Sequence, residues 1–282
     1  MLHKIYVRTL ESYPERTEWA KKELARVGIV DYEFYQNLDR SSKILDKWKD
    51  EGKIKLGPEC FQCQKLDCSC RAKILTRGMV ANFISTLMLF EKIIQDEMPD
   101  DTMYMIMEDD IYFQDNAKDV IEHTFGEDFR KTFNTKKPLL LKLGWGDMME
   151  YRQTHYEVSA GMHVFKKESN KFSNPCYAGN KHLFKFLLKE FKRIETACDM
   201  WIHRYMSPKV ENYEIIPALC KELSHVGSIP SAMHIKYSTA TKFLDLFSRT
   251  QDQRYIDKFI EAEKEYFNYW FKYGKNEWGI DW

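Results

Sequence analysis

The sequence has neither a long apolar run nor a net charge. Its longest apolar stretch covers residues 79–90, well short of the about 20 residues that a transmembrane helix needs. Its 43 basic and 43 acidic residues cancel, so the excess of Lys and Arg by which a general nucleic-acid binder contacts phosphates is missing. The first residues also lack the apolar core of a signal peptide. We therefore expect a soluble, cytoplasmic protein with no transmembrane segment and no nucleic-acid partner.

Neither an internal repeat nor a low-complexity linker divides the 282 residues, of which 44% are hydrophobic. A chain of this length can bury a sizeable core. We expect residues 1–235 to form the main domain. Residues 236–282 are expected to be a helical extension, because a stripe of apolar side chains runs along them. This stripe favours packing on the main domain over a membrane or partner surface; it consists of Tyr255, Ile256, Phe259, Ile260, Phe267, Trp270 and Phe271.

Strand and helix patterns alternate along the main domain. Residues 4–7 and 31–35 are β-rich, and residues 15–27 between them have a helical composition. Such a β-α-β start favours a parallel sheet with helices on its faces. Further helices are expected at residues 78–95, 117–122 and 181–194, and further strands at 103–107, 138–143, 162–165 and 176–178. The predicted fold class is α/β, with a Rossmann-type mixed sheet flanked by helices.

Four of the seven cysteines fall in one short stretch, at Cys60, Cys63, Cys68 and Cys70. This stretch belongs to a loop at residues 56–72, within a polar, Lys-rich excursion from the sheet. Four thiolates can close a tetrahedral Zn²⁺ site that leaves no open position, so we assign the cluster to loop stability. Disulfides and unbridged thiols are the alternatives, and the missing secretory signal disfavours disulfides.

Three consecutive acids, Glu108, Asp109 and Asp110, directly follow the apolar run at 103–107. Adjacent carboxylates repel one another, which is costly at the tip of a buried strand unless a cation is bound there. This edge of an open α/β sheet is also where ligands bind. Hard oxygen ligands suit Mg²⁺ or Mn²⁺, and such an ion can stabilise the charge on a departing diphosphate. The alternative is a solvated turn after a strand.

Several segments resemble, in order, those of GT-A glycosyltransferases, most closely family 25 (lipopolysaccharide and collagen galactosyltransferase-like). Residues 106–111, Ile-Met-Glu-Asp-Asp-Ile, are similar to the Leu-Glu-Asp-Asp-Val type motif of that family. Residues 4–16 are similar to its opening strand and Arg-containing helix start. Residues 76–85 resemble the segment before the acidic motif, although Thr86 follows Ser85 where the family usually has histidine. Residues 175–178 resemble its acceptor-side segment with an altered order.

This resemblance, which spans about residues 1–235, implies a GT-A-like fold and a set of roles at the donor site. Asp110 would contact the metal and the diphosphate, with Glu108 or Asp109 nearby on the sugar or metal. Arg8 or Arg16 would contact the nucleotide, and Ser85 would lie at the donor site.

A histidine in the segment Ser-His-Val-Gly-Ser, His225, resembles the late metal ligand of many GT-A enzymes, with His234 as the competing choice. An imidazole ligand would favour Mn²⁺ over Mg²⁺. The alternative is a structural histidine.

Asp199 is the candidate base that would take the proton of the acceptor hydroxyl. It serves equally well as a helix N-cap, and Asp147 and Glu168 are the fallback bases. Trp145 stands between two glycines after a strand, where it could stack on a sugar face or cap the core.

The sequence thus predicts a metal-dependent hexosyl- or pentosyltransferase. It would move a sugar from a nucleotide-diphosphate donor, expected to be a UDP-sugar, to a hydroxyl on a glycan or glycoprotein, with inversion by family analogy. A nucleotidyltransferase is one alternative, but the segment from Arg8 to Arg16 has no glycine for a phosphate loop. The other is an inactive transferase-like scaffold that acts as a zinc-stabilised interaction module.

Overall fold

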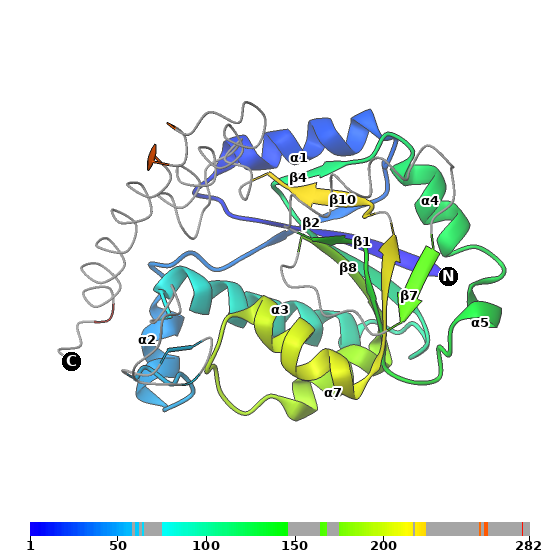
Figure 1. Ribbon diagram of the computed structural model, residues 1–282. Helices are drawn as coiled ribbons and strands as arrows, with labels where there is room; N and C mark the ends of the chain where they lie inside the picture. Colours follow the sequence, from blue (N-terminus) through cyan, green and yellow to red (C-terminus); the bar gives the residue numbers. More distant parts are fainter. Residues whose placement is uncertain are drawn as a thin grey trace. The chain divides into compact units, whose positions relative to one another are not determined.

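The structure is a computed structural model of the chain (Figure 1). It describes residues 1–57, 60–61, 64, 75–145, 164–167, 175–216, 218–223, 254, 257–258 and 278. The chain divides into two compact units. The first, here called the sheet unit, consists of residues 1–37, 85–191 and 199–222; the second consists of residues 38–84, 192–198 and 223–282.

Among the described residues, the larger sheet has seven strands in the order β2-β1-β3-β8-β5-β9-β7. They are β1 (Leu2–Thr9), β2 (Glu33–Gln36), β3 (Met103–Glu108), β5 (Leu139–Lys142), β7 (Val164–Lys167), β8 (Cys176–Asn180) and β9 (Glu211–Ile216). β1 is parallel to β2 and β3, and β5 is parallel to β9. β8 is antiparallel to β3 and β5, and β7 to β9. The predicted fold class, a mixed α/β sheet flanked by helices, is confirmed.

A smaller sheet of three short strands continues from the end of β3. It consists of β4 (Ile111–Phe113), β6 (Gly144–Trp145) and β10 (Cys220–Glu222), with β10 in the middle. β10 is antiparallel to β4 and parallel to β6. Its register places Glu222 opposite Ile111, so an acid from late in the chain arrives directly beside the acidic triplet.

The helices are α1 (Pro14–Arg26), α2 (Lys43–Asp50), α3 (Arg77–Gln95), α4 (Ala117–Thr124), α5 (Phe129–Thr132), α7 (Lys181–Glu190) and α8 (Cys198–Met200). A π-helix, η2 (Trp201–Met206), and a 3₁₀ turn, η3 (Ser207–Lys209), follow α8. The helices predicted at 15–27, 78–95 and 117–122 are confirmed within about two residues.

One helix prediction needs correction, and one helix was missed. The helix predicted at 181–194 ends at Glu190, because the backbone turns extended at Phe191, and Ile194 instead forms a β-bridge with Ile54 in the second unit. α2 was not predicted in the polar excursion. Ser42 begins it by accepting a hydrogen bond from the Ile44 amide.

The core of the sheet unit lies on both faces of the large sheet. Met103, Met105 and Met107 of β3 face a buried cluster that includes residues of α1 and α4. On the opposite face, Phe184 of α7 packs against Phe90, at 4.8 Å between ring centroids, and edge-on against Tyr104 of β3. β3 is therefore buried on both sides, as its uninterrupted apolar run predicts.

Within the described parts of the chain, no helix has the length and apolarity to cross a membrane. The predicted helical extension at 236–282 lies almost wholly outside the described residues and stays a prediction. Four of its residues are described, namely Arg254, Asp257, Lys258 and Trp278. Trp278 is buried in the second unit, where its indole N–H donates to the Leu75 carbonyl at 2.8 Å and the Arg77 guanidinium lies 4.9 Å from its ring.

Candidate active site at the end of strand β3

Strand β3 brings the acidic triplet to the edge of the sheet. Glu108 is its last residue, Asp109 and Asp110 form the turn, and Ile111 begins β4. The parallel pairing of β1 with β3 places Arg8 opposite Glu108. Because parallel strands end at the same edge of a sheet, basic residues at the end of β1 and acidic residues at the end of β3 meet there.

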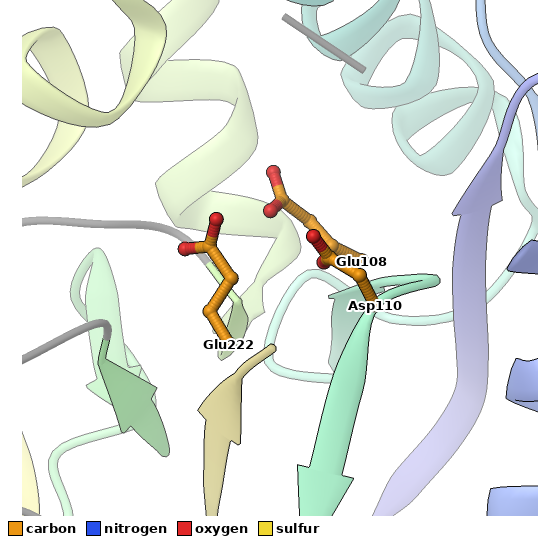
Figure 2. A group of neighbouring side chains, drawn as sticks. All are labelled: Glu108, Asp110 and Glu222. Carbon is orange, nitrogen blue, oxygen red and sulfur yellow. The ribbon is translucent and has the colours of Figure 1, made fainter. Parts of the chain in front are cut away.

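Three carboxylates converge at this edge, from Glu108, Asp110 and Glu222 (Figure 2). One oxygen of each lies within 4.8 Å of the others. Glu222 reaches them from β10, whereas the other two come from the end of β3 and its turn (Figure 2). Asp110 and Glu222 are buried, and Glu108 is partly exposed. Because Asp110 is buried, the acidic triplet is not the fully solvated turn that was the alternative prediction.

The electrostatics of the cluster are those of crowded acids. Loss of hydration raises the pKa of Glu108 well above its ordinary value, and the carboxylates of Glu222 and Asp110 raise it further. Arg8 and Arg16 oppose this shift. The cluster therefore has a strong tendency to bind positive charge.

Arg16 lies in the first turn of α1 and is only 7% exposed. One of its terminal nitrogens, Nη2, is 2.5 Å from Asp109 Oδ1 and 2.9 Å from Asp110 Oδ2. Burial raises the pKa of Asp109, while Arg16 and a hydrogen bond from the Thr9 hydroxyl oppose the rise. Arg16 thus compensates both aspartates directly.

The donor set fits a hard divalent ion. Carboxylate oxygens are the ligands that Mg²⁺ and Mn²⁺ prefer, and both ions tolerate further oxygen ligands from a phosphate. Three carboxylates on a strand end, a turn and a neighbouring strand can hold such an ion while leaving part of its coordination sphere open.

The structure thus brings Arg8, Arg16 and the acidic triplet to one edge of the sheet, and their roles toward metal and nucleotide stay predictions. Arg8 is buried, and its Nε donates to Asn37 Oδ1 at 3.3 Å. Glu222 was missed. It is separated from the short apolar run Ala218-Leu219-Cys220 by Lys221, so no local pattern marks it as Glu108 is marked.

Other predicted site residues lie elsewhere or beyond the described residues. Ser85 is buried within α3, and Asp199 is half-buried in α8. The backbone of Trp145 pairs with Lys221 in the small sheet, and its side chain is not described. Cys60 is buried. The residues outside the described ranges are Cys63, Cys68, Cys70, Asp147, Glu168, His225 and His234.

A mixed α/β sheet with clustered acids at the end of a central strand is an arrangement suited to phosphate-bearing ligands. The sequence model of glycosyltransferase family 25 (LPS biosynthesis protein) matches residues 2–202, which is well over half of the chain. The protein therefore belongs to glycosyltransferase family 25, and the predicted resemblance is confirmed.

Among solved structures, the chain is similar to the apo-form glycosyltransferase GlyE of Streptococcus pneumoniae TIGR4. The two share 12% sequence identity with a TM-score of 0.36, and the match covers 96% of this chain but 64% of that one. This chain thus spans less than two thirds of that protein, and so distant a likeness adds no argument about function. A comparison with curated proteins gave no match.

Proposed function

We propose that the protein is a metal-dependent glycosyltransferase. It moves a sugar from a nucleotide-diphosphate donor, for which we propose a UDP-sugar, to a hydroxyl of a glycan or glycoprotein. The observation that carries this proposal is the convergence of Glu108, Asp110 and Glu222 within 4.8 Å, in a chain of glycosyltransferase family 25.

Glu108, Asp110 and Glu222 would hold the divalent ion. When bound, such an ion supplies positive charge to a departing diphosphate. Arg8, on the neighbouring strand β1, adds a positive charge at the same edge, which favours the binding of an anionic donor. These residues therefore supply the electrostatic part of the proposed catalysis.

Asp199 is the proposed base for the acceptor hydroxyl. It lies half-buried in α8, immediately before the π-helix η2. π-Helical turns are frequent at functional sites. If the acceptor oxygen attacks the anomeric carbon opposite the departing diphosphate while Asp199 takes its proton, the transfer inverts the anomeric configuration. The base role and the inverting outcome are proposed together.

Metal selectivity depends on the third and fourth ligands. With Glu222 the donor set consists of oxygen atoms alone, which suits Mg²⁺ and Mn²⁺ alike. His225, if it joins them, would favour Mn²⁺. The Cys60, Cys63, Cys68 and Cys70 cluster is proposed separately as a structural Zn²⁺ site in the second unit.

The test is a thermal-shift and calorimetric titration with UDP, GDP and CMP, each with Mn²⁺, with Mg²⁺ or with EDTA. We expect UDP with a divalent ion to raise the melting temperature of the wild type. Glu222→Gln should weaken Mn²⁺ binding by about tenfold or more, since it removes one carboxylate ligand.

Glu211→Gln is the matched control, because Glu211 begins β9 at the opposite end of the sheet. It should bind Mn²⁺ as the wild type does. A Glu222→Gln variant with wild-type Mn²⁺ affinity would overturn the proposed metal site. Donor hydrolysis followed by mass spectrometry then identifies the sugar.

A further inference from the structure

Of the two buried cations at the site, Arg8 and Arg16, Arg16 contacts the acids directly. Its Nη2 lies 2.5 Å from Asp109 and 2.9 Å from Asp110, so a single nitrogen joins two neighbouring carboxylates. Asp109 and Asp110 are themselves buried. A salt bridge this well shielded from water is screened much less than a surface pair.

The acids around Arg16 would repel one another at this sheet edge without a positive charge beside them. Glu108, Asp109, Asp110 and Glu222 contribute four carboxyl groups, and all but Glu108 are buried. Buried like charges destabilise one another, and a buried charge that loses its partner is strongly destabilising. The protein must therefore stabilise this cluster before any ion arrives.

The contacts divide the four acids into two overlapping groups. Asp110 belongs to both, because it pairs with Arg16 and also lies among the three convergent carboxylates. Asp109 pairs with Arg16 and accepts from the Thr9 hydroxyl, and it is not among the three. Arg16 thus restrains the Asp110 carboxylate from the side of Asp109.

We propose that Arg16 is a positioning residue, a built-in counter-cation that keeps the site formed when no divalent ion is bound. It compensates Asp109 and Asp110 in the ion-free protein and restrains the Asp110 carboxylate beside Glu108 and Glu222. The divalent ion would then enter a preformed cluster. The binding of that ion rests on the proposed function, whereas the compensation of Asp109 and Asp110 by Arg16 does not.

The experiment compares melting temperatures in EDTA and in saturating Mn²⁺. Arg16→Met should lower the melting temperature in EDTA by about 10 °C, since it leaves buried acids without their partner. Mn²⁺ should restore much of this loss, because the ion replaces the missing positive charge and binds only the folded state. The Mn²⁺-induced shift of Arg16→Met should therefore exceed that of the wild type. Arg16→Lys, which keeps the charge, should respond to Mn²⁺ as the wild type does.

Arg26→Met is the matched control on the same helix. Arg26 pairs with Glu23 and Asp115, neither of which is among the convergent carboxylates. Its loss in melting temperature should be the same with and without Mn²⁺. An equal loss in both conditions for Arg16→Met would mean that Arg16 only packs, and would overturn the proposal.

A charge rescue gives a second, independent readout. Arg16→Met/Asp109→Asn removes the cation together with one acid, so it should melt higher in EDTA than Arg16→Met alone. A double variant no more stable than the single one contradicts charge compensation. If Arg16→Met does not fold in EDTA, the double variant should, and failure of both also overturns the proposal.

The two proposals fail in different ways. If the wild type shows no response to Mn²⁺ or Mg²⁺, the proposed metal site is wrong, yet the comparison of single and double variants in EDTA still tests Arg16. If the wild type binds Mn²⁺ and the rescue is absent, the role of Arg16 is wrong and the metal site stands.

Discussion

At the scale of single residues, the Asn180 side chain makes four hydrogen bonds to the backbone of the sheet unit. Its side-chain oxygen accepts from the amides of Leu183, at 3.0 Å, and Leu139, at 3.1 Å. Its amide nitrogen donates to the carbonyls of Thr135 and Lys137, at 2.9 and 2.8 Å. One fully buried side chain therefore caps α7 and fixes the segment that enters β5.

Asn180→Ala should lower the free energy of unfolding by about 3 kcal/mol, because it leaves four backbone groups without their partner. Ser42→Ala is the matched control, since Ser42 caps α2 with a single hydrogen bond of 3.4 Å, and it should cost less than about 1 kcal/mol. Urea unfolding followed by circular dichroism measures both. Equal losses in the two variants would contradict this assignment.

At the scale of secondary structure, the position of Glu222 depends on how closely β6 approaches β10. A Cβ added to Gly144 would clash with the Cys220 thiol and lie 2.9 Å from the Cys220 carbonyl oxygen. Gly144 pairs directly with Cys220, two residues before Glu222. Glycine at this position therefore lets β6 pair closely with β10. This pairing sets the position of the Glu222 carboxylate.

Gly144→Ala should displace β10, destabilise the protein by about 1–3 kcal/mol and weaken Mn²⁺ binding by about tenfold. Gly179→Ala is the control. A Cβ added at Gly179 would lie 2.5 Å from Leu183 Cδ2 and 3.1 Å from Phe184 Cζ. Gly179 pairs with Tyr104, away from the carboxyl end of β3. This substitution should reduce stability and leave the Mn²⁺ affinity of the folded protein unchanged. Calorimetric titration below the melting temperature separates the two effects, and equal Mn²⁺ affinities in the two variants would disprove the link.

The elements that could be predicted from sequence are those with a pattern of their own. The apolar run of β3 and the helical composition of α1 are local features, so both were found. β10 has three residues and depends on pairing with β4 and β6, which no local pattern specifies. The same holds for Glu222, whose place beside Asp110 is set by that pairing. The acids of β3 were predicted because they are adjacent in sequence.

At the scale of the whole molecule, equal numbers of acidic and basic residues do not reveal which charges are buried within the large sheet. Lys142 of β5 pairs with Tyr177 of β8 and with Glu214 of β9. The buried ring of His203 packs edge-on against Tyr177, with 5.7 Å between the ring centroids. Burial lowers the pKa of His203 well below its ordinary value, and the charge of Lys142 lowers it further. His203 is therefore neutral in the folded protein.

This neutral histidine should make the molecule sensitive to mild acid. The unfolded chain takes up a proton at His203 below about pH 6.5 while the folded protein does not, so stability falls as the pH falls through that value. Between pH 7 and 5.5 the contribution is about 1 kcal/mol. Asp100, whose pKa is lowered by Lys185, loses its contribution only near pH 4 and below.

We therefore expect the stability difference between wild type and His203→Gln to shrink by about 1 kcal/mol from pH 7 to 5.5. The substitution removes the titrating group, and all other acids and bases are common to both proteins, so their titrations cancel in the difference. Urea unfolding at four pH values between 5.5 and 7 measures it. Parallel stability curves for the two proteins would show that His203 titrates in the folded protein as it does in the unfolded chain, and would refute the prediction.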